Sequence, residues 1–354
     1  MPSFLQQSSN VAAGNLGGRI VGIYILLIAA NLAAWTWALV TFRHFPLLLG
    51  TAFLAYGFGL RHAVDADHIA AIDNVTRKLM QEGKRPVAVG LFFSLGHSTI
   101  VIMATVAVAA TATAFKDQFE SFHSICGFVG TLVSASFMLA IAIINLIILA
   151  GVYRTFQHVR AGGRYVDEDM NKMLAQRGFV ARRVRPLFRI IGQSWHMYPL
   201  GFLFGLGFDT ATEVGLLGIS AAEASKGLSV WSILVFPALF TAGMMLIDTT
   251  DSILMLGAYG WAFVKPVRKL YYNMTITFVS VIVALAVGGI ESLGLIGGKL
   301  SLDGPFWAMI GDLNDNFGVI GYVIIGIFVL CWIVSFMIYR AKRYDEMEVR
   351  MTAQ

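Results

Sequence analysis

Residues 61–72 read RHAVDADHIAAI, and this polar stretch lies inside a long apolar part of the chain. It contains Arg61, His62, Asp65, Asp67 and His68, whose side chains are all costly to place in lipid. Of the 354 residues, 57% are hydrophobic and 13% are charged, whereas about 25% are charged in an ordinary soluble domain. The composition therefore predicts a polytopic membrane protein, and a membrane protein that keeps these groups together requires a functional reason.

The apolar residues occur in runs long enough to cross a bilayer, which takes about 20 helical residues. Eight runs qualify, at residues 20–41, 47–70, 87–112, 127–151, 196–220, 230–256, 272–296 and 317–339. We expect an all-α polytopic membrane protein with eight transmembrane helices. Its expected parts are an N-terminal segment (1–19), helices 1–4 with the polar stretch in helix 2 (20–151), a basic loop (152–195), helices 5–8 (196–339) and a C-terminal tail (340–354).

The basic residues predict the orientation of these spans. If both termini are cytoplasmic, the outside loops hold only Arg43, Lys116, Lys226 and Lys299, and Arg61 lies within a span. Every other member of the 26 Lys and Arg residues then faces the cytoplasm, as the positive-inside rule requires. We predict that both termini, the loop and the tail are cytoplasmic.

Several classes of protein fit the sequence poorly. The basic residues gather in a few loops, which argues against a nucleic-acid partner. No G-x-x-x-x-G-K-[ST] pattern occurs, so an ATPase domain within the chain is not expected. Cys126 and Cys331 are far apart in apolar segments, which argues against a disulfide framework. The oligomeric state is left open.

A short internal echo joins the two halves of the chain. FGL at 58–60 precedes RHAVDADH, and FGL at 204–206 precedes GFDTATE. In the expected topology these two helices run in opposite directions, so the echo is compatible with two inverted repeats, which in transporters place the substrate site at their interface. Three matching residues are equally compatible with chance.

The polar residues of the spans have the chemistry of a metal pathway. On an ideal helix His62, Asp65 and His68 share one face, while Asp67 points elsewhere. Imidazole and carboxylate ligands suit divalent first-row metals, and nickel accepts a tetragonal arrangement of nitrogen and oxygen ligands. The predicted metal ligands are His62, Asp65, Asp67, His68 and His97. The predicted pathway and supporting residues are Asn31, Ser98, Thr99, Asp209, Thr210, Glu213, Asp248 and Asp251.

Structural roles compete with this interpretation. A single intramembrane histidine such as His97 is often only a hydrogen-bonded packing residue. The aspartates could form a proton relay or pair with Arg61, and for Asp248 and Asp251 a structural role weighs as much as a functional one. Packing explains least well the motif around His62 and His68, because it has four ionisable groups within seven residues.

Four stretches resemble the signature motifs of the nickel/cobalt transporter (NiCoT) family of secondary permeases, and the chain is most similar to nickel-selective, high-affinity members. They are RHAVDADHI, SLGHSTIV, LGFDTATE and the GM…DTTD run. The resemblance covers essentially the whole chain, and it implies metal binding by His62, Asp67 and His68. Val64 within the motif is typical of nickel-selective relatives. Phe208 stands where many relatives carry histidine, which leaves Asp209 and Glu213 as the transferable positions.

The residues and the resemblance together predict a secondary transporter and not an enzyme. It would import Ni²⁺, or Co²⁺, across the bacterial cytoplasmic (inner) membrane by alternating access, driven by the membrane potential or a proton gradient. The metal ion is then substrate, no prosthetic group is expected, and the other partner is membrane lipid. The alternatives are a membrane-embedded metalloenzyme that uses the same cluster and a metal exporter.

Overall fold

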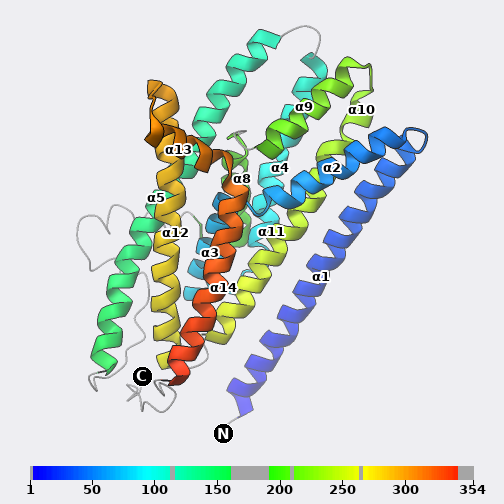
Figure 1. Cartoon of the computed structure of the whole chain (residues 1–354). Helices are drawn as coiled ribbons and strands as arrows, with labels where there is room; N and C mark the ends of the chain where they lie inside the picture. The colour runs from blue at the N-terminus through cyan, green and yellow to red at the C-terminus, as the bar shows by residue number, and fades with distance from the viewer. Residues whose placement is uncertain (1–2, 112–115, 161–190, 208–210, 263–265, 342–354) are drawn as a thin grey trace. The chain divides into compact units, whose positions relative to one another are not determined.

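A computed structural model describes residues 3–111, 116–160, 191–207, 211–262 and 266–341 (Figure 1). Within these ranges all the regular structure is helical, as the sequence predicts. The helices are α1 (Ser3–Phe42), α2 (Pro46–His62), α3 (Ala66–Gln81), α4 (Val89–Thr111), α5 (Lys116–Arg160), the 3-10 turn η1 (Ser194–His196), α8 (Met197–Phe204), α9 (Ala211–Ser225), α10 (Val230–Ile233), α11 (Val235–Ala262), α12 (Pro266–Leu300), α13 (Pro305–Asp315) and α14 (Phe317–Ala341).

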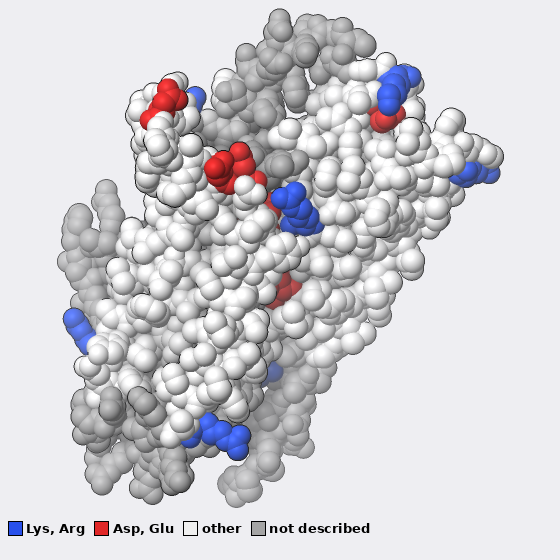
Figure 2. All heavy atoms as spheres, viewed as in Figure 1, with Lys and Arg blue, Asp and Glu red and all other residues white. Residues whose placement is uncertain are grey.

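Among the described residues, six helices are long and apolar enough to cross a membrane. They cover Leu16–Phe42, Val89–Ala109, Gly127–Arg154, Val230–Gly260, Met274–Leu300 and Phe317–Ile338. Each coincides with an expected span, because an apolar run of about 20 residues forms a helix long enough to cross the bilayer. Charged side chains are sparse on the face drawn in Figure 2. The chain is a multi-pass membrane protein.

The second expected span is broken within the opening motif. Helix α2 ends at His62, and α3 begins at Ala66 after a bend. Asp65 has extended backbone angles (φ −64°, ψ 148°) and is the N-cap of α3, a position that aspartate favours. The prediction of one continuous helical face carrying His62, Asp65 and His68 is therefore wrong. With this pair taken as one span, the described residues give seven spans.

Helix α3 also extends past the expected membrane edge at residue 70, as far as Gln81. Arg77 and Lys78, which the sequence placed in a cytoplasmic loop, are instead buried helical residues with 1% and 8% exposure. A hydropathy argument misses this segment because its polar groups pair with one another inside the bundle.

The fifth expected span is interrupted as well. Helix α8 ends at Phe204 and α9 begins at Ala211. Asp209 and Thr210, which the sequence predicts on the pathway, lie outside the described residues.

The chain divides into two compact units. The first contains Met1–Val64, Arg85–Gly130 and Ser194–Ile253, and the second contains Asp65–Lys84, Thr131–Gln193 and Leu254–Gln354. An apolar core in the first unit joins α1, α2, α9 and α11, where Phe42 and Phe236 stack with ring centroids 5.5 Å apart. In the second unit α3 packs against α12 and α14.

Candidate metal site

His62 is the last residue of α2 and is 1% exposed. Its position depends on Gly59, one turn earlier, because a Cβ there would lie 2.0 Å from the backbone oxygen of Phe240. Glycine thus lets α2 touch the backbone of α11. The Phe240 ring lies 5.5 Å from the His62 ring, measured between centroids, so an aromatic side chain packs beside the imidazole.

His97 lies in the middle of α4 and is 2% exposed. The preceding residue, Gly96, lies against α8, where an added Cβ would come within 2.0 Å of the backbone oxygen of Tyr198. Close approach through small residues is how helices associate in lipid. The α4–α8 contact therefore determines where the His97 imidazole lies.

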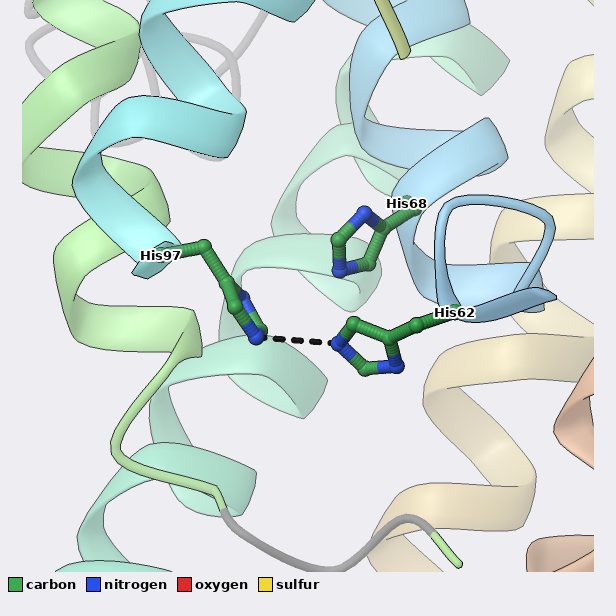
Figure 3. A group of neighbouring side chains, drawn as sticks. All are labelled: His62, His68 and His97. Atoms are coloured by element: carbon green, nitrogen blue, oxygen red, sulfur yellow. Dashed lines mark hydrogen bonds between the residues drawn. The ribbon is translucent and has the colours of Figure 1, made fainter. Parts of the chain in front are cut away.

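Helix α9 supplies the third group, Glu213, from its first turn. Its Oε1 atom is 2.8 Å from His97 Nε2 and 3.8 Å from His62 Nε2. The two imidazoles are themselves hydrogen-bonded, with 2.9 Å between His62 Nε2 and His97 Nε2 (Figure 3, dashed line). Three ligand-type atoms from α2, α4 and α9 thus converge in a buried site.

These spacings match those of metal ligands. At a metal–ligand distance of about 2.0–2.1 Å, two ligands at right angles are about 2.9 Å apart. The separations of His97 Nε2 from His62 Nε2 and from Glu213 Oε1, 2.9 and 2.8 Å, have this value. A right angle between neighbouring ligands is the geometry of tetragonal nickel sites. The third separation, 3.8 Å between His62 Nε2 and Glu213 Oε1, is wider than a right angle gives, so the three atoms must shift to bind one divalent ion together.

The charges and helix ends favour a cation here. His62 ends α2, where the helix macrodipole is negative, and this arrangement stabilises a positive ion. Broken helices that direct their carboxyl ends at a cation are a recurring device of transporters. Glu213 adds a carboxylate that is 2% exposed, which offsets part of the charge of a desolvated divalent ion.

Thr212 contacts the His62 ring nitrogen that does not face His97. Its hydroxyl Oγ1 lies 3.2 Å from His62 Nδ1, on the side of the ring away from His97. A hydrogen bond to the second ring nitrogen is the usual support of a metal-binding histidine, because it fixes the ring and its tautomer.

The rest of the opening motif lies at the start of α3. His68 is fully buried, and its role as a ligand stays a prediction. Asp65 is the N-cap of α3 and Asp67 lies in its first turn, where the macrodipole stabilises carboxylates. The ligand roles of Asp65 and Asp67 stay predictions.

Other predicted pathway residues have structural partners. The Asn31 amide donates to the backbone oxygens of Leu27 and Ala242, at 2.9 and 3.2 Å. The Thr99 hydroxyl donates to the backbone oxygen of Leu95 at 2.8 Å and lies 2.9 Å from the Tyr198 hydroxyl. The contacts to Ala242 and Tyr198 join neighbouring helices. The pathway roles of Asn31 and Thr99 stay predictions.

Three further polar residues of the predicted pathway lie on α4 and α11. Ser98 follows His97 and is 1% exposed, and Asp248 on α11 is fully buried. Asp251 lies one turn later and is partly buried. Their pathway roles stay predictions.

Sequence reasoning did not predict two contacts of the site. It placed Glu213 on the pathway without a partner, and it gave Thr212 no role. The only signal was that both belong to the polar GFDTATE stretch. Its proximity to His62 and His97 depends on the packing of α9 against α2 and α4, which no local pattern reveals.

Comparison with known proteins gives consistent matches. The family model NicO, described as high-affinity nickel-transport protein, matches residues 48–338. A high-affinity nickel transport protein of Cupriavidus necator is 63% identical over 339 residues, 96% of this chain and 97% of that protein. The nickel transporter NicT of Mycobacterium tuberculosis is 43% identical over 93% of this chain and 90% of its own length. The cobalt transport protein NhlF of Rhodococcus rhodochrous is 40% identical over 80% and 81% of the two chains. No solved structure gives a significant match.

Proposed function

Since this chain belongs to the NicO family of high-affinity nickel-transport proteins, we propose that it carries Ni²⁺ inward across the bacterial cytoplasmic membrane by alternating access. It is a nickel/cobalt transporter and not an enzyme, because its relatives are named for nickel or cobalt transport. The metal ion is its substrate. Family membership supports the transporter interpretation and gives no support to the metalloenzyme or the exporter.

The observation that carries the proposal is the convergence of His62 Nε2, His97 Nε2 and Glu213 Oε1 within hydrogen-bond and ion-pair distances. We infer that these atoms are ligands of the transported ion, with His68 as a further imidazole ligand. Nickel is favoured because two relatives named for nickel, at 63% and 43% identity, are more similar to this chain than the relative named for cobalt, at 40%. Cobalt is the secondary substrate.

The proposed topology has eight spans with both termini in the cytoplasm. The six apolar helices and the α2–α3 pair support seven of them. The eighth is the α8–α9 pair, whose apolar sequence is interrupted between Phe204 and Ala211. One FGL sequence, at 58–60, precedes the first interruption, and the other, at 204–206, begins at the last residue of α8. This echo supports the interpretation of the two halves as inverted repeats with broken helices at the substrate site.

The membrane potential is a sufficient source of energy. A divalent ion that enters through 100 mV gains about 4.6 kcal/mol, which corresponds to roughly a thousandfold accumulation. Uniport therefore needs no nucleotide, and a proton gradient is the alternative source.

The test is uptake of radioactive Ni²⁺ into cells that express the wild type, His62→Ala, His97→Ala or Glu213→Gln at matched membrane abundance. His44→Ala is the matched control, because His44 is exposed in the connection between α1 and α2. We expect uptake by the wild type and the control, inhibition by excess Co²⁺, no inhibition by Mg²⁺, and loss in the three site variants. Wild-type uptake no greater than in empty cells would refute the function, and normal uptake by the site variants would refute the site.

A further inference from the structure

A buried polar cluster lies on α3, within the second unit. Asp73, Asn74 and Arg77 are 0%, 4% and 1% exposed. Charged residues are rarely buried this completely unless they are paired. The metal site described above uses none of them.

Arg77 and Asn74 connect α3 to two other helices. The Arg77 guanidinium donates from Nη1 to the Thr277 hydroxyl on α12 at 2.8 Å, and from Nη2 to Asn74 Oδ1 at 2.7 Å. The Asn145 amide on α5 donates to the same Asn74 oxygen at 2.6 Å. Arg77 thus has direct and indirect hydrogen bonds that hold α3 against α5 and α12.

Asp73 makes the connection to α11 and a second one to α12. Its Oδ1 accepts a hydrogen bond from the Tyr259 hydroxyl, and its Oδ2 accepts one from Ser280 Oγ at 3.0 Å. Both carboxylate oxygens therefore serve as acceptors. Arg77 follows one helical turn later on the same face, so the cluster combines one negative and one positive charge.

This arrangement suits a fixed anchor better than a proton carrier. A proton added to Asp73 would occupy an oxygen that already accepts from a hydroxyl and would leave the Arg77 charge without its counterion. Asp73, Asn74 and Arg77 form hydrogen bonds with three different helices. These bonds fix the position of α3 along its axis and its orientation about that axis.

The same helix carries His68, five residues before Asp73. On a rigid helix this spacing corresponds to about 7.5 Å along the axis and about 140° around it. The anchored face is thus turned away from the face that presents His68. A change in the anchor would move the His68 imidazole without touching it.

We propose that Asp73 and Arg77 are positioning residues for metal recognition, which hold α3 so that His68 is presented to the transported ion. This inference rests on the proposed transport of Ni²⁺ and on His68 as a ligand. It adds a role for the conspicuous AIDNVTR segment at residues 71–77, which the transport site does not otherwise use.

The experiment compares Asp73→Asn, Arg77→Gln and the double variant with the wild type, at matched membrane abundance. The readouts are KM and maximal rate of Ni²⁺ uptake, the Kd for Ni²⁺ of the detergent-purified protein, and its Tm. We expect each single variant to raise KM and Kd by about 10–100-fold, the range for partners that orient metal ligands. The double variant should regain Tm, because no lone charge is buried, but it should keep the raised KM and Kd.

Tyr259→Phe is the milder variant if the charged-site variants fail to fold. It removes one hydroxyl that donates to Asp73, and we expect a smaller rise of KM with little loss of protein. Ser134→Ala is the control, because it removes a buried hydrogen bond of the same unit, 2.7 Å to Glu291 Oε1, that does not involve α3. The control should keep the wild-type KM.

Several outcomes would overturn the inference. Lower Tm with unchanged KM and Kd would make the cluster merely structural, and a double variant with wild-type KM would make its role purely one of charge balance. His97→Ala is measured in the same assay. If the wild type takes up no Ni²⁺ the proposed function itself fails, whereas uptake that depends on His97 but not on the anchor refutes only the anchor.

Discussion

Shortening Glu213 to aspartate is expected to impair Ni²⁺ binding as severely as neutralising it to glutamine. Glu213 Oε1 is 2.8 Å from His97 Nε2, close to the spacing of neighbouring ligands around one ion. Removing one methylene withdraws the carboxylate by about 1.5 Å, which leaves it roughly 4 Å from His97. The Asp variant keeps the negative charge, but its shorter side chain cannot bring the carboxylate to the metal ion.

The expected loss is about 100-fold in Kd, the upper end of the range measured when partners that support a ligand are removed. This corresponds to about 2.7 kcal/mol of binding free energy. The assay is calorimetric titration of Ni²⁺ into purified wild type, Glu213→Asp and Glu213→Gln, combined with the KM of uptake. Glu223→Gln is the control, because Glu223 lies on the same helix and pairs with Lys226 at 2.8 Å instead of a histidine.

Three results are informative. Equal losses in the Asp and Gln variants support direct coordination. Wild-type affinity in the Asp variant would show that only the charge of Glu213 matters, and wild-type affinity in both variants would remove Glu213 from the site.

The remaining predictions concern the supports of the site. Gly96→Ala forces a Cβ to within 2.0 Å of a backbone oxygen of α8, and we expect a destabilisation of about 1–3 kcal/mol together with lost uptake. Gly218→Ala, where a Cβ meets nothing within 4 Å, is the control, and equal thermal stability of the two variants would contradict the close packing. Thr212→Val removes the hydroxyl that lies 3.2 Å from His62 Nδ1 and should raise Kd about tenfold, while Thr212→Ser should not; equal Kd values for Val and Ser would show that the hydroxyl does not orient the ring. Asn31→Ala loses two hydrogen bonds to backbone oxygens and should lower the free energy of unfolding by about 1–2 kcal/mol at constant Kd; a raised Kd would place Asn31 on the pathway.

Helix breaks show where local sequence patterns stop being informative. The apolar runs predict six spans correctly, because bilayer thickness and helical rise fix their length. The run at 47–70 also looks continuous, yet the helix ends at His62 and starts again at Ala66. An aspartate at the N-cap is visible only in retrospect, since aspartate within a polar motif is equally consistent with a ligand.

Charge counting shows the same limit. The sequence places Arg77 and Lys78 in a cytoplasmic loop because they are basic and follow the end of the apolar run near residue 70. In the structure Arg77 is instead buried beside Asp73, Asn74 and Thr277. Its partners come from α3 itself and from a helix 200 residues later in the sequence. Such pairing cancels the cost on which the prediction depended.

By itself the sequence determined that this protein is an all-helical membrane protein, and it predicted that histidine and carboxylate groups within the spans bind the metal ion. Those conclusions follow from composition and residue type, which act through the hydrophobic effect and the cost of burying charge. Only the tertiary structure decided which groups meet. His62, His97 and Glu213 come from three helices far apart in the sequence, and their 2.8–3.8 Å spacings depend on helix contacts through Gly59 and Gly96. Packing of backbone against backbone is a long-range property, and no local pattern encodes it.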